Sequence, residues 1–216
     1  MYKRQVLHAG NYGVPESRER VFFIGIRKDA LRDEALNALQ SLEIPDEYNP
    51  YPKPTHSATV DLPGLLDIVT TSDVLEGLKE PEDTIDASQQ LYSKAKYLSS
   101  GQGQTEIRLD NLGPTIRSEH HGNIEFRRLS LEHGGKHYEE LSAGLRERRL
   151  TPRECALIQT FPPDYRFVMR NTNGRGFRLS SSGAYKVIGN AVPPVLAFNI
   201  AMRLQELWDV YFKNDN

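Results

Sequence analysis

The sequence predicts an α/β fold, and three patterns lead to this prediction. Strand patterns occupy residues 5–9 and 20–27, and the second is a continuous apolar run, typical of a strand that is covered on both faces. A helix with strong capping residues begins near residue 151. In the last part of the chain, apolar side chains recur every three or four positions, as on a helix that buries one stripe.

Composition limits the class of protein. The 216 residues, 38% of them hydrophobic, suffice for one domain or two small lobes. A single cysteine excludes an internal disulfide and fits a reducing cytoplasm, and we find no apolar run that predicts a membrane span. The net charge of -2 argues against a globally basic nucleic-acid binder, but basic side chains outnumber acidic ones by about 14 to 10 over residues 105–190.

The first half alternates short elements with loops. A turn at residues 11–15, Asn-Tyr-Gly-Val-Pro, separates the two strands, and we expect a charged helix over residues 28–42. We then expect a Pro-rich loop over residues 44–56 and a short helix that begins with cap residues at Thr70. A loop over residues 80–90 and a flexible connection over residues 99–104 follow.

In the second half, Ile124 and Phe126 alternate with polar residues, which predicts a strand, and the Gly-Asn pair at 122–123 predicts a turn between two strands. Thr151, Pro152 and Glu154 form a capping box with proline in the first helical turn, and residues 161–163, Phe-Pro-Pro, end that helix.

The last helix follows a Gly-Asn turn and two prolines, in the segment Tyr-Lys-Val-Ile-Gly-Asn-Ala-Val-Pro-Pro at residues 185–194. Free N–H groups in its first turn could hold a carboxylate or the polar edge of a cofactor, although most helix starts bind nothing. The expected buried stripe consists of Leu196, Ile200, Leu204, Leu207 and Tyr211.

Three segments, residues 11–26, 150–162 and 185–194, resemble in this order the last three motif blocks of the DNA (cytosine-5) methyltransferases. The resemblance covers both ends of the chain well and the middle loosely. The Pro-Cys nucleophile, the Glu-Asn-Val acid motif and the Gly-rich cofactor loop of that family do not occur in these 216 residues. The chain therefore resembles the C-terminal half of such an enzyme.

The resemblance implies an α/β fold that forms the C-terminal part of a Rossmann-like S-adenosylmethionine-dependent methyltransferase, together with a mixed, loop-rich target-recognition domain. Residues 1–28 would form edge strands of the catalytic domain and residues 29–149 the target-recognition domain. Residues 150–216 would return to the catalytic domain and end in the C-terminal helix.

Arg18 and Arg20 are two apart in extended chain, so both guanidinium groups should leave the same face. A guanidinium fork suits phosphate and carbonyl oxygen. The resemblance places Arg20 on a flipped cytosine and Arg18 nearer the DNA backbone; the alternative is a surface pair with Glu16 and Glu19. Glu16 stands where the family usually has glutamine, which puts in doubt the hydrogen bond that the amide would donate.

The resemblance also implies binding residues. One wall of an S-adenosylmethionine pocket would come from Gly189, Asn190, Ala191 and Val192, which could equally cap and dock the helix. Contacts with duplex DNA would come from Thr115, Ile116, Arg117, His120, His121, Arg127 and Arg128, unless these form a solvated hairpin. Arg175 and Arg178 lie in a Gly-rich loop and could hold phosphates, but a solvated loop is favoured.

Two other patterns are interpreted as structural. Cys155 lies inside the capped helix beside Leu150, and the family nucleophile belongs to another motif. His133 and His137 have helical spacing, but two glycines lie between them, so we expect no zinc or other metal site.

The implied function is methyl transfer to C5 of a flipped cytosine, in the cytoplasm, with duplex DNA and a polypeptide carrying the Pro-Cys and Glu-Asn-Val motifs as partners. The chain alone would be inactive and would expose an apolar patch. Two alternatives remain: a non-catalytic DNA-binding remnant, and a fragment of a longer methyltransferase.

Overall fold

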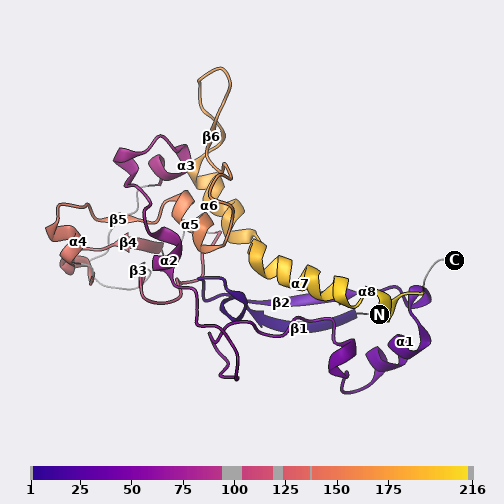
Figure 1. Ribbon diagram of the computed structural model, residues 1–216. Helices are drawn as coiled ribbons and strands as arrows, with labels where there is room; N and C mark the ends of the chain where they lie inside the picture. The colour runs from indigo at the N-terminus through magenta and orange to yellow at the C-terminus, as the bar shows by residue number, and fades with distance from the viewer. Residues whose placement is uncertain (1, 94–103, 119–123, 137, 214–216) are drawn as a thin grey trace.

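The computed structural model describes residues 2–93, 104–118, 124–136 and 138–213, and Figure 1 shows their arrangement. The strands are β1 (Tyr2–His8), β2 (Glu19–Gly25), β3 (Gln104–Glu106), β4 (Ile124–Arg128), β5 (Arg148–Arg149), β6 (Met169–Arg170) and β7 (Phe177–Leu179). The α-helices are α1 (Asp33–Gln40), α2 (Thr71–Leu75), α3 (Ala87–Gln90), α4 (Tyr138–Ser142), α5 (Pro152–Ile158), α6 (Ser181–Asn190), α7 (Pro194–Glu206) and α8 (Trp208–Tyr211). Single 3-10 turns are η1 (Ala9–Tyr12), η2 (Lys28–Ala30), η3 (Asp46–Tyr48), η4 (Pro81–Asp83) and η5 (Leu131–His133).

The predicted α/β class is confirmed, since the structure combines helices with small sheets. β1 and β2 pair antiparallel with Val6 opposite Val21, and α7 lies along them (Figure 1). Leu7 and Leu196 share one buried cluster between the strands and the helix. The other face leaves Val6, Val21 and Phe23 exposed at 55%, 52% and 64%. The prediction that the apolar run is covered on both faces is therefore wrong for this chain, and the expected exposed apolar patch is present.

Residues 29–56 pack with the strands and the C-terminal helices. Leu31 and Leu39 are buried against Leu207 and Tyr211. The hydroxyl of Tyr51 lies 2.7 Å from the carbonyl oxygen of Lys3, on β1. By these contacts the segment packs with β1, β2 and the C-terminal helices, and the boundary expected near residue 28 stays a prediction. Its helix is shorter than predicted, because η2 and α1 replace a continuous helix over residues 28–42.

A second core joins α2, α5 and α6 to the middle of the chain. Its buried side chains include Leu75, Ile107, Ile116, Ile158 and Ile188. Next to it, β4 pairs in parallel with β3 and antiparallel with β5. Before the turn that the sequence predicts at residues 122–123, the described residues 114–118 form no strand. The turn at 122–123 and most of the connection at 99–104 lie outside the described residues.

Helix starts follow the sequence closely. Both Thr70 and Thr151 form the full capping box, the first with Asp73 and the second with Glu154. The helix after Thr151 ends at Ile158, before the prolines, and Thr160 adopts a φ of 64°. Residues 80–90, predicted as loop, contain the short helices η4 and α3.

The Gly-Asn pair at 189–190 ends a helix that the sequence analysis did not predict. Ser180 caps α6, and the segment from Ala191 to Pro193 separates it from α7. The predicted stripe is confirmed: Leu196, Leu207 and Tyr211 are buried, and Ile200 and Leu204 are partly buried.

By length and composition alone, the stretch Ser181–Glu206 is apolar enough to cross a membrane, contrary to the expectation from the sequence. The two prolines after Val192 interrupt it, and only 22% of its most apolar window is buried in the chain. A single such stretch is weak support for a membrane span. Its exposed side chains, Val187, Val192, Phe198 and Met202, are also what a protein-docking surface requires.

Candidate functional site

The segment before β2 and the segment after residue 112 lie side by side and hold the candidate site together. Glu16 and Gly113 form a parallel bridge. The N–H of Ser17 donates to the Gly113 carbonyl at 2.8 Å, and the N–H of Gly113 donates to the Pro15 carbonyl at 3.0 Å. The motif segment before β2 and the segment at Gly113, about a hundred residues apart in sequence, thus share a backbone ladder.

Arg18 joins three segments. Its side chain is 3% exposed, and its guanidinium donates to the carbonyl oxygens of Ile116 (3.1 Å), Gly189 (2.8 Å) and Ala191 (3.0 Å). Burial lowers the pKa of Arg18 from its ordinary value. The guanidinium faces the chain itself, so the DNA-backbone contact implied by the resemblance would require these bonds to break.

Glu16 lies beside Arg18 and is fully buried. Its Oε1 accepts the N–H of Ile116 at 2.6 Å and lies 3.4 Å from Nη1 of Arg18, whereas Oε2 has no partner among the described residues. Burial raises the pKa of Glu16 to about 7, against the smaller opposing effect of Arg18. Near neutral pH the protonated and the charged forms of the carboxyl therefore coexist, and the protonated form is neutral and can donate, like the amide of glutamine.

Arg20 has the opposite environment. It is exposed, and its guanidinium donates to the carbonyl of Glu19 at 2.6 Å. The strand period that groups Arg18 with Arg20 does not distinguish a buried arginine from an exposed one. Of this pair, it is Arg20 that presents its guanidinium to solvent.

The expected cofactor wall divides in two. Gly189 is buried against the backbone of residues 117–118, and a Cβ on it would lie 2.3 Å from the backbone nitrogen of Ser118. Asn190 is exposed and Val192 is 46% exposed, next to the half-buried Ala191. The N–H of Val195, in the first turn of α7, donates to the Thr160 hydroxyl at 3.1 Å, so this part of the predicted anion site is already occupied.

The expected DNA-contacting residues also separate by environment. The Thr115 hydroxyl donates to the Ser17 carbonyl, and Arg117 is exposed. Both line a cavity of about 190 Å³ together with Glu125, whose pKa burial raises to about 7. Ile116 is 1% exposed, so its side chain belongs to the core and cannot touch DNA. His120 and His121 lie outside the described residues.

Arg127 and Arg128 form ion pairs with glutamate side chains of the same chain. Arg128 is fully buried and contacts Glu80 at 2.6 Å and Glu140 at 2.9 Å, while Arg127 contacts Glu140 at 2.8 Å. A buried guanidinium needs such counter-charges. The prediction that these two arginines read DNA is therefore not supported by their geometry, and nothing in a strand period indicates a partner 48 residues away.

Cys155 is 2% exposed, and burial raises the pKa of its thiol well above the ordinary value, as expected for a structural cysteine. Nδ1 of His133 lies 2.7 Å from Glu147. Within the part of the chain that the structure describes, no group of three or more histidine, cysteine and acidic side chains could hold a metal ion. His137 is not among those residues.

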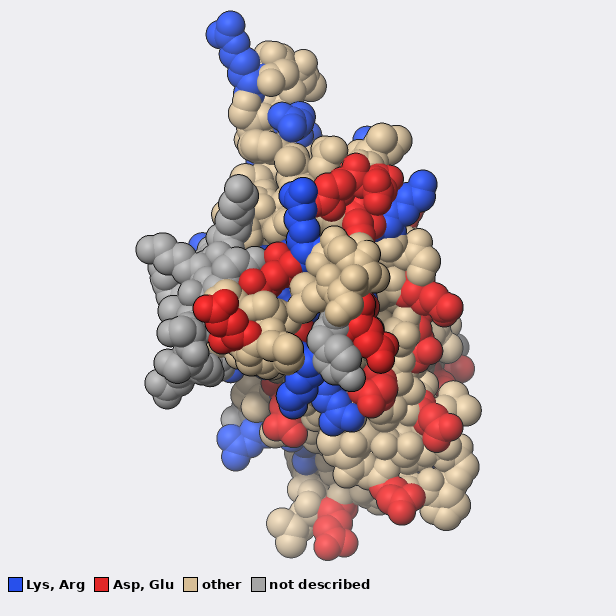
Figure 2. Space-filling view, turned by 90° about the vertical axis from the view of Figure 1, so that its left-hand side faces the viewer, with Lys and Arg blue, Asp and Glu red and all other residues tan. Residues whose placement is uncertain are grey.

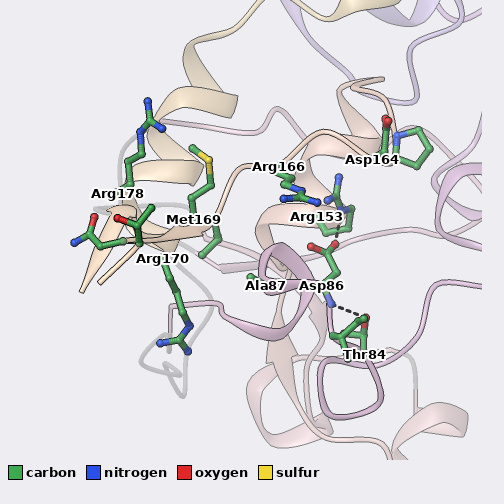
Figure 3. A pocket seen from close by; sticks show the side chains of 14 residues that line it. Thr84, Asp86, Ala87, Arg153, Asp164, Arg166, Met169, Arg170 and Arg178 are labelled. Carbon is green, nitrogen blue, oxygen red and sulfur yellow. Dashed lines mark hydrogen bonds and ion pairs between the residues drawn. The ribbon is translucent and has the colours of Figure 1, made fainter. Parts of the chain in front are cut away.

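Sequence reasoning gave no role to Arg153, Arg166 and Arg170, which together with Arg178 line the cavity in Figure 3. The basic excess over residues 105–190 was the only signal for them. It could not locate them, because they come from different elements.

Several Type II methyltransferases are similar to this chain. M.MthTI of Methanothermobacter thermautotrophicus is 26% identical over 206 residues, which cover 94% of this chain and 55% of the relative. M.NgoPII of Neisseria gonorrhoeae is 28% identical over 212 residues (92% and 53%), and M.DdeI of Desulfomicrobium norvegicum is 28% identical over 238 residues (98% and 55%). The chain thus spans about half the length of these relatives.

A crystal structure of a Spodoptera frugiperda DNMT2 variant matches 96% of this chain and 58% of its own length, with 18% identity and a TM-score of 0.48. A likeness this distant supports no inference about the site. The family model for C-5 cytosine-specific DNA methylases, by contrast, matches residues 1–206. The chain therefore belongs to the C-5 cytosine-specific DNA methylase family.

Proposed function

We propose that this chain is the C-terminal portion, or subunit, of a DNA (cytosine-5) methyltransferase. It recognises duplex DNA, grips the flipped cytosine and completes the S-adenosylmethionine pocket. The family match over residues 1–206 and the coverage of about half of each relative support this assignment.

One observation carries the division of labour. Attack on C6 of cytosine requires a reactive thiolate. The single cysteine of the sequence, Cys155, lies inside α5, is 2% exposed and has a raised pKa. The nucleophile must therefore come from a polypeptide that carries the Pro-Cys and Glu-Asn-Val motifs, whether separate or covalently joined to this chain.

The apolar surface supports such a partner. Val6, Val21 and Phe23 are exposed on the free face of β1–β2, and Phe198 and Met202 are exposed on α7 at 63% and 40%. Contiguous apolar side chains of this size are stabilised when another protein surface covers them. In a complex that acts on DNA in the cytoplasm, the partner polypeptide, and not lipid, would cover these apolar faces.

Each side chain at the site then has a task. Arg20 holds a base oxygen or flanking phosphate with its exposed fork. Arg18 and Glu16 position Ile116 and the segment from Gly189 to Ala191 by the bonds described above. Thr115 and Arg117 face the duplex, and the exposed amide of Asn190 beside apolar Val192 fits a cofactor with polar and apolar edges. S-adenosylmethionine supplies the methyl group when bound.

Labelled methyl transfer to duplex DNA tests the proposal. We expect no transfer by this chain alone and transfer when a polypeptide with the two missing motifs is added. Arg20→Met should lower transfer by at least about tenfold without changing the melting temperature, because its guanidinium is exposed. Arg18→Met should instead lower the free energy of unfolding by about 2–4 kcal/mol, because three carbonyls lose their donor.

Full activity of the chain alone would refute the division of labour. DNA binding that is unaffected by the added polypeptide, with no methyl transfer, would favour a non-catalytic DNA-binding remnant. An Arg20→Met protein that melts earlier but transfers methyl groups normally would remove Arg20 from the site.

A further inference from the structure

A groove of about 950 Å³ opens in the recognition part of the molecule, and the family motifs give it no function. Three segments line it (Figure 3): residues 84–87 at the start of α3, Arg153 in α5, and residues 163–178 around the β6–β7 hairpin. The groove is large enough for several consecutive groups of an extended ligand.

The lining is predominantly basic. Four arginines, Arg153, Arg166, Arg170 and Arg178, face it, against the carboxylates of Asp86 and Asp164. Asp86 is already engaged, because it accepts the N–H of Ser88 at 2.9 Å and lies 2.6 Å from Nε of Arg153.

Three of these arginines keep exposed guanidinium groups. Among the described residues, Arg166, Arg170 and Arg178 form no ion pair, and Arg170 lies 5.2 Å over the ring of Phe177. The groove is therefore lined by guanidinium charges that carboxylates among the described residues do not neutralise.

Arg153 supplies an independent indication of a ligand. Its side chain is only 4% exposed, yet Nη1 is buried without a hydrogen-bond partner in the described part of the chain. An unpaired buried donor costs about 1–3 kcal/mol. Arg166 and Arg153 line the same groove (Figure 3), so a ligand bound there meets both side chains.

The hairpin carries two of the arginines outward. Met169 pairs with Leu179 and Arg170 with Phe177, and the turn between the strands projects from the top of the molecule in Figure 1. In Figure 2, basic side chains reach out at this end, whereas acidic and further basic side chains occur lower on the same face.

We propose that this groove binds the sugar–phosphate backbone of DNA, with Arg166, Arg170 and Arg178 contacting phosphates and Arg153 donating Nη1 to one of them. This inference rests on the proposed function, which supplies DNA as the ligand. It adds a contact that is separate from Thr115 and Arg117 and is independent of base sequence, because guanidinium forks on phosphates fix position without reading bases.

Fluorescence anisotropy of a labelled duplex with the full chain, as a function of salt, tests the groove. The triple variant Arg166→Gln/Arg170→Gln/Arg178→Gln should bind at least about tenfold more weakly on every duplex sequence, and its slope of log affinity against log salt should fall by roughly 2 to 3. The matched control is Arg27→Gln/Arg108→Gln/Arg146→Gln, which removes the same charge from side chains that are 80%, 67% and 82% exposed. The control should lose less than half a unit of slope, and equal melting temperatures confirm that all the proteins are folded.

Each of the following results would contradict the proposal that the groove binds the DNA backbone. If the wild-type chain binds DNA and the triple variant shows the same salt slope, the groove does not contact DNA, and the proposed function is unaffected. If the wild-type chain binds no DNA, both fall. If poly-glutamate of equal charge competes as well as DNA, or if millimolar inorganic phosphate shifts the Arg166 Nε signal while DNA does not, the groove is a general anion site.

Discussion

Glu16 shows how one residue that departs from a family pattern can keep the chemistry of the residue it replaces. Its backbone position is fixed by the ladder to Gly113, and its carboxyl is fully buried on the Ile116 N–H. Burial moves the pKa to about 7, so a titratable group stands where an amide would be neutral at every pH. The sequence identified the position and the substitution, but the protonation state depends on a segment about a hundred residues away.

A pH dependence follows from this. Because the pKa of Glu16 in the folded chain (about 7) lies above the ordinary 4.5, its contribution to stability is present below pH 4.5 and is lost as the pH rises through 7. Glu16→Gln should remove a fall in unfolding free energy of up to about 3 kcal/mol between pH 5 and pH 8. Urea titrations at several pH values measure it.

The difference between the wild type and Glu16→Gln isolates Glu16 from the other groups that titrate between pH 5 and pH 8. Glu125 contributes in the same direction, since its pKa is also raised to about 7, and His8 contributes in the opposite one. Exposed Glu43→Gln is the control and should leave the pH profile unchanged. A Glu16→Gln protein with the same slope as the wild type would contradict a protonated Glu16.

At the scale of elements, the parts that the sequence predicted are those that short-range rules govern. The capping box at Thr151, the helix start at Thr70 and the apolar spacing from Leu196 to Tyr211 depend on neighbouring residues along one helix, and all are present. The pairing of β4 was not predicted, because its partners β3 and β5 lie outside the local window. α6 was missed because Gly189 and Asn190 were interpreted as a turn.

Gly189 is needed for packing rather than for a turn. A Cβ there would lie 2.3 Å from the Ser118 nitrogen and 2.4 Å from the Arg117 carbonyl carbon, both backbone atoms that cannot move aside cheaply. Gly189→Ala should therefore lower the free energy of unfolding by about 1–3 kcal/mol, measured by thermal or urea denaturation. This is opposite to the usual gain from alanine in a helix.

The control lies in the same helix. In Gly183→Ala the nearest atom is Cδ1 of Leu179, at 2.8 Å, the end of a flexible side chain. This variant should be close to neutral in stability. Equal effects of the two substitutions would mean that the contact with residues 117–118 does not constrain α6.

At the scale of the whole molecule, the free face of β1–β2 sets the behaviour of the isolated chain. Val6, Val21 and Phe23 lie together in water, and they form one face of an antiparallel pair. The sequence identified the run as apolar and strand-like. The missing motifs led to the expectation of an exposed apolar patch, but the sequence could not tell which side chains of the run would form it, since that depends on how β1, β2 and α7 pack together.

We expect the isolated chain to self-associate through this face. Sedimentation velocity at increasing concentration should show oligomers, and Val21→Thr/Phe23→Thr should shift them toward monomer while keeping β-branched side chains in the strand. Leu42→Thr/Leu131→Thr, at scattered positions that are 101% and 71% exposed, is the control and should not change the distribution. A wild-type chain that remains monomeric at high concentration would argue against a docking face here.

The position of Arg18 has a mechanical consequence. One side chain fastens Ile116 to Gly189 at the end of α6 and to Ala191 in the link to α7, across sequence separations of 98, 171 and 173 residues. Under the proposed function, a displacement of residues 115–117 by bound duplex would reach the stretch of Asn190 and Val192 through that guanidinium and through the packing of Gly189 on residues 117–118. Occupancy of one ligand and affinity for the other would then be linked by the same free energy in both directions.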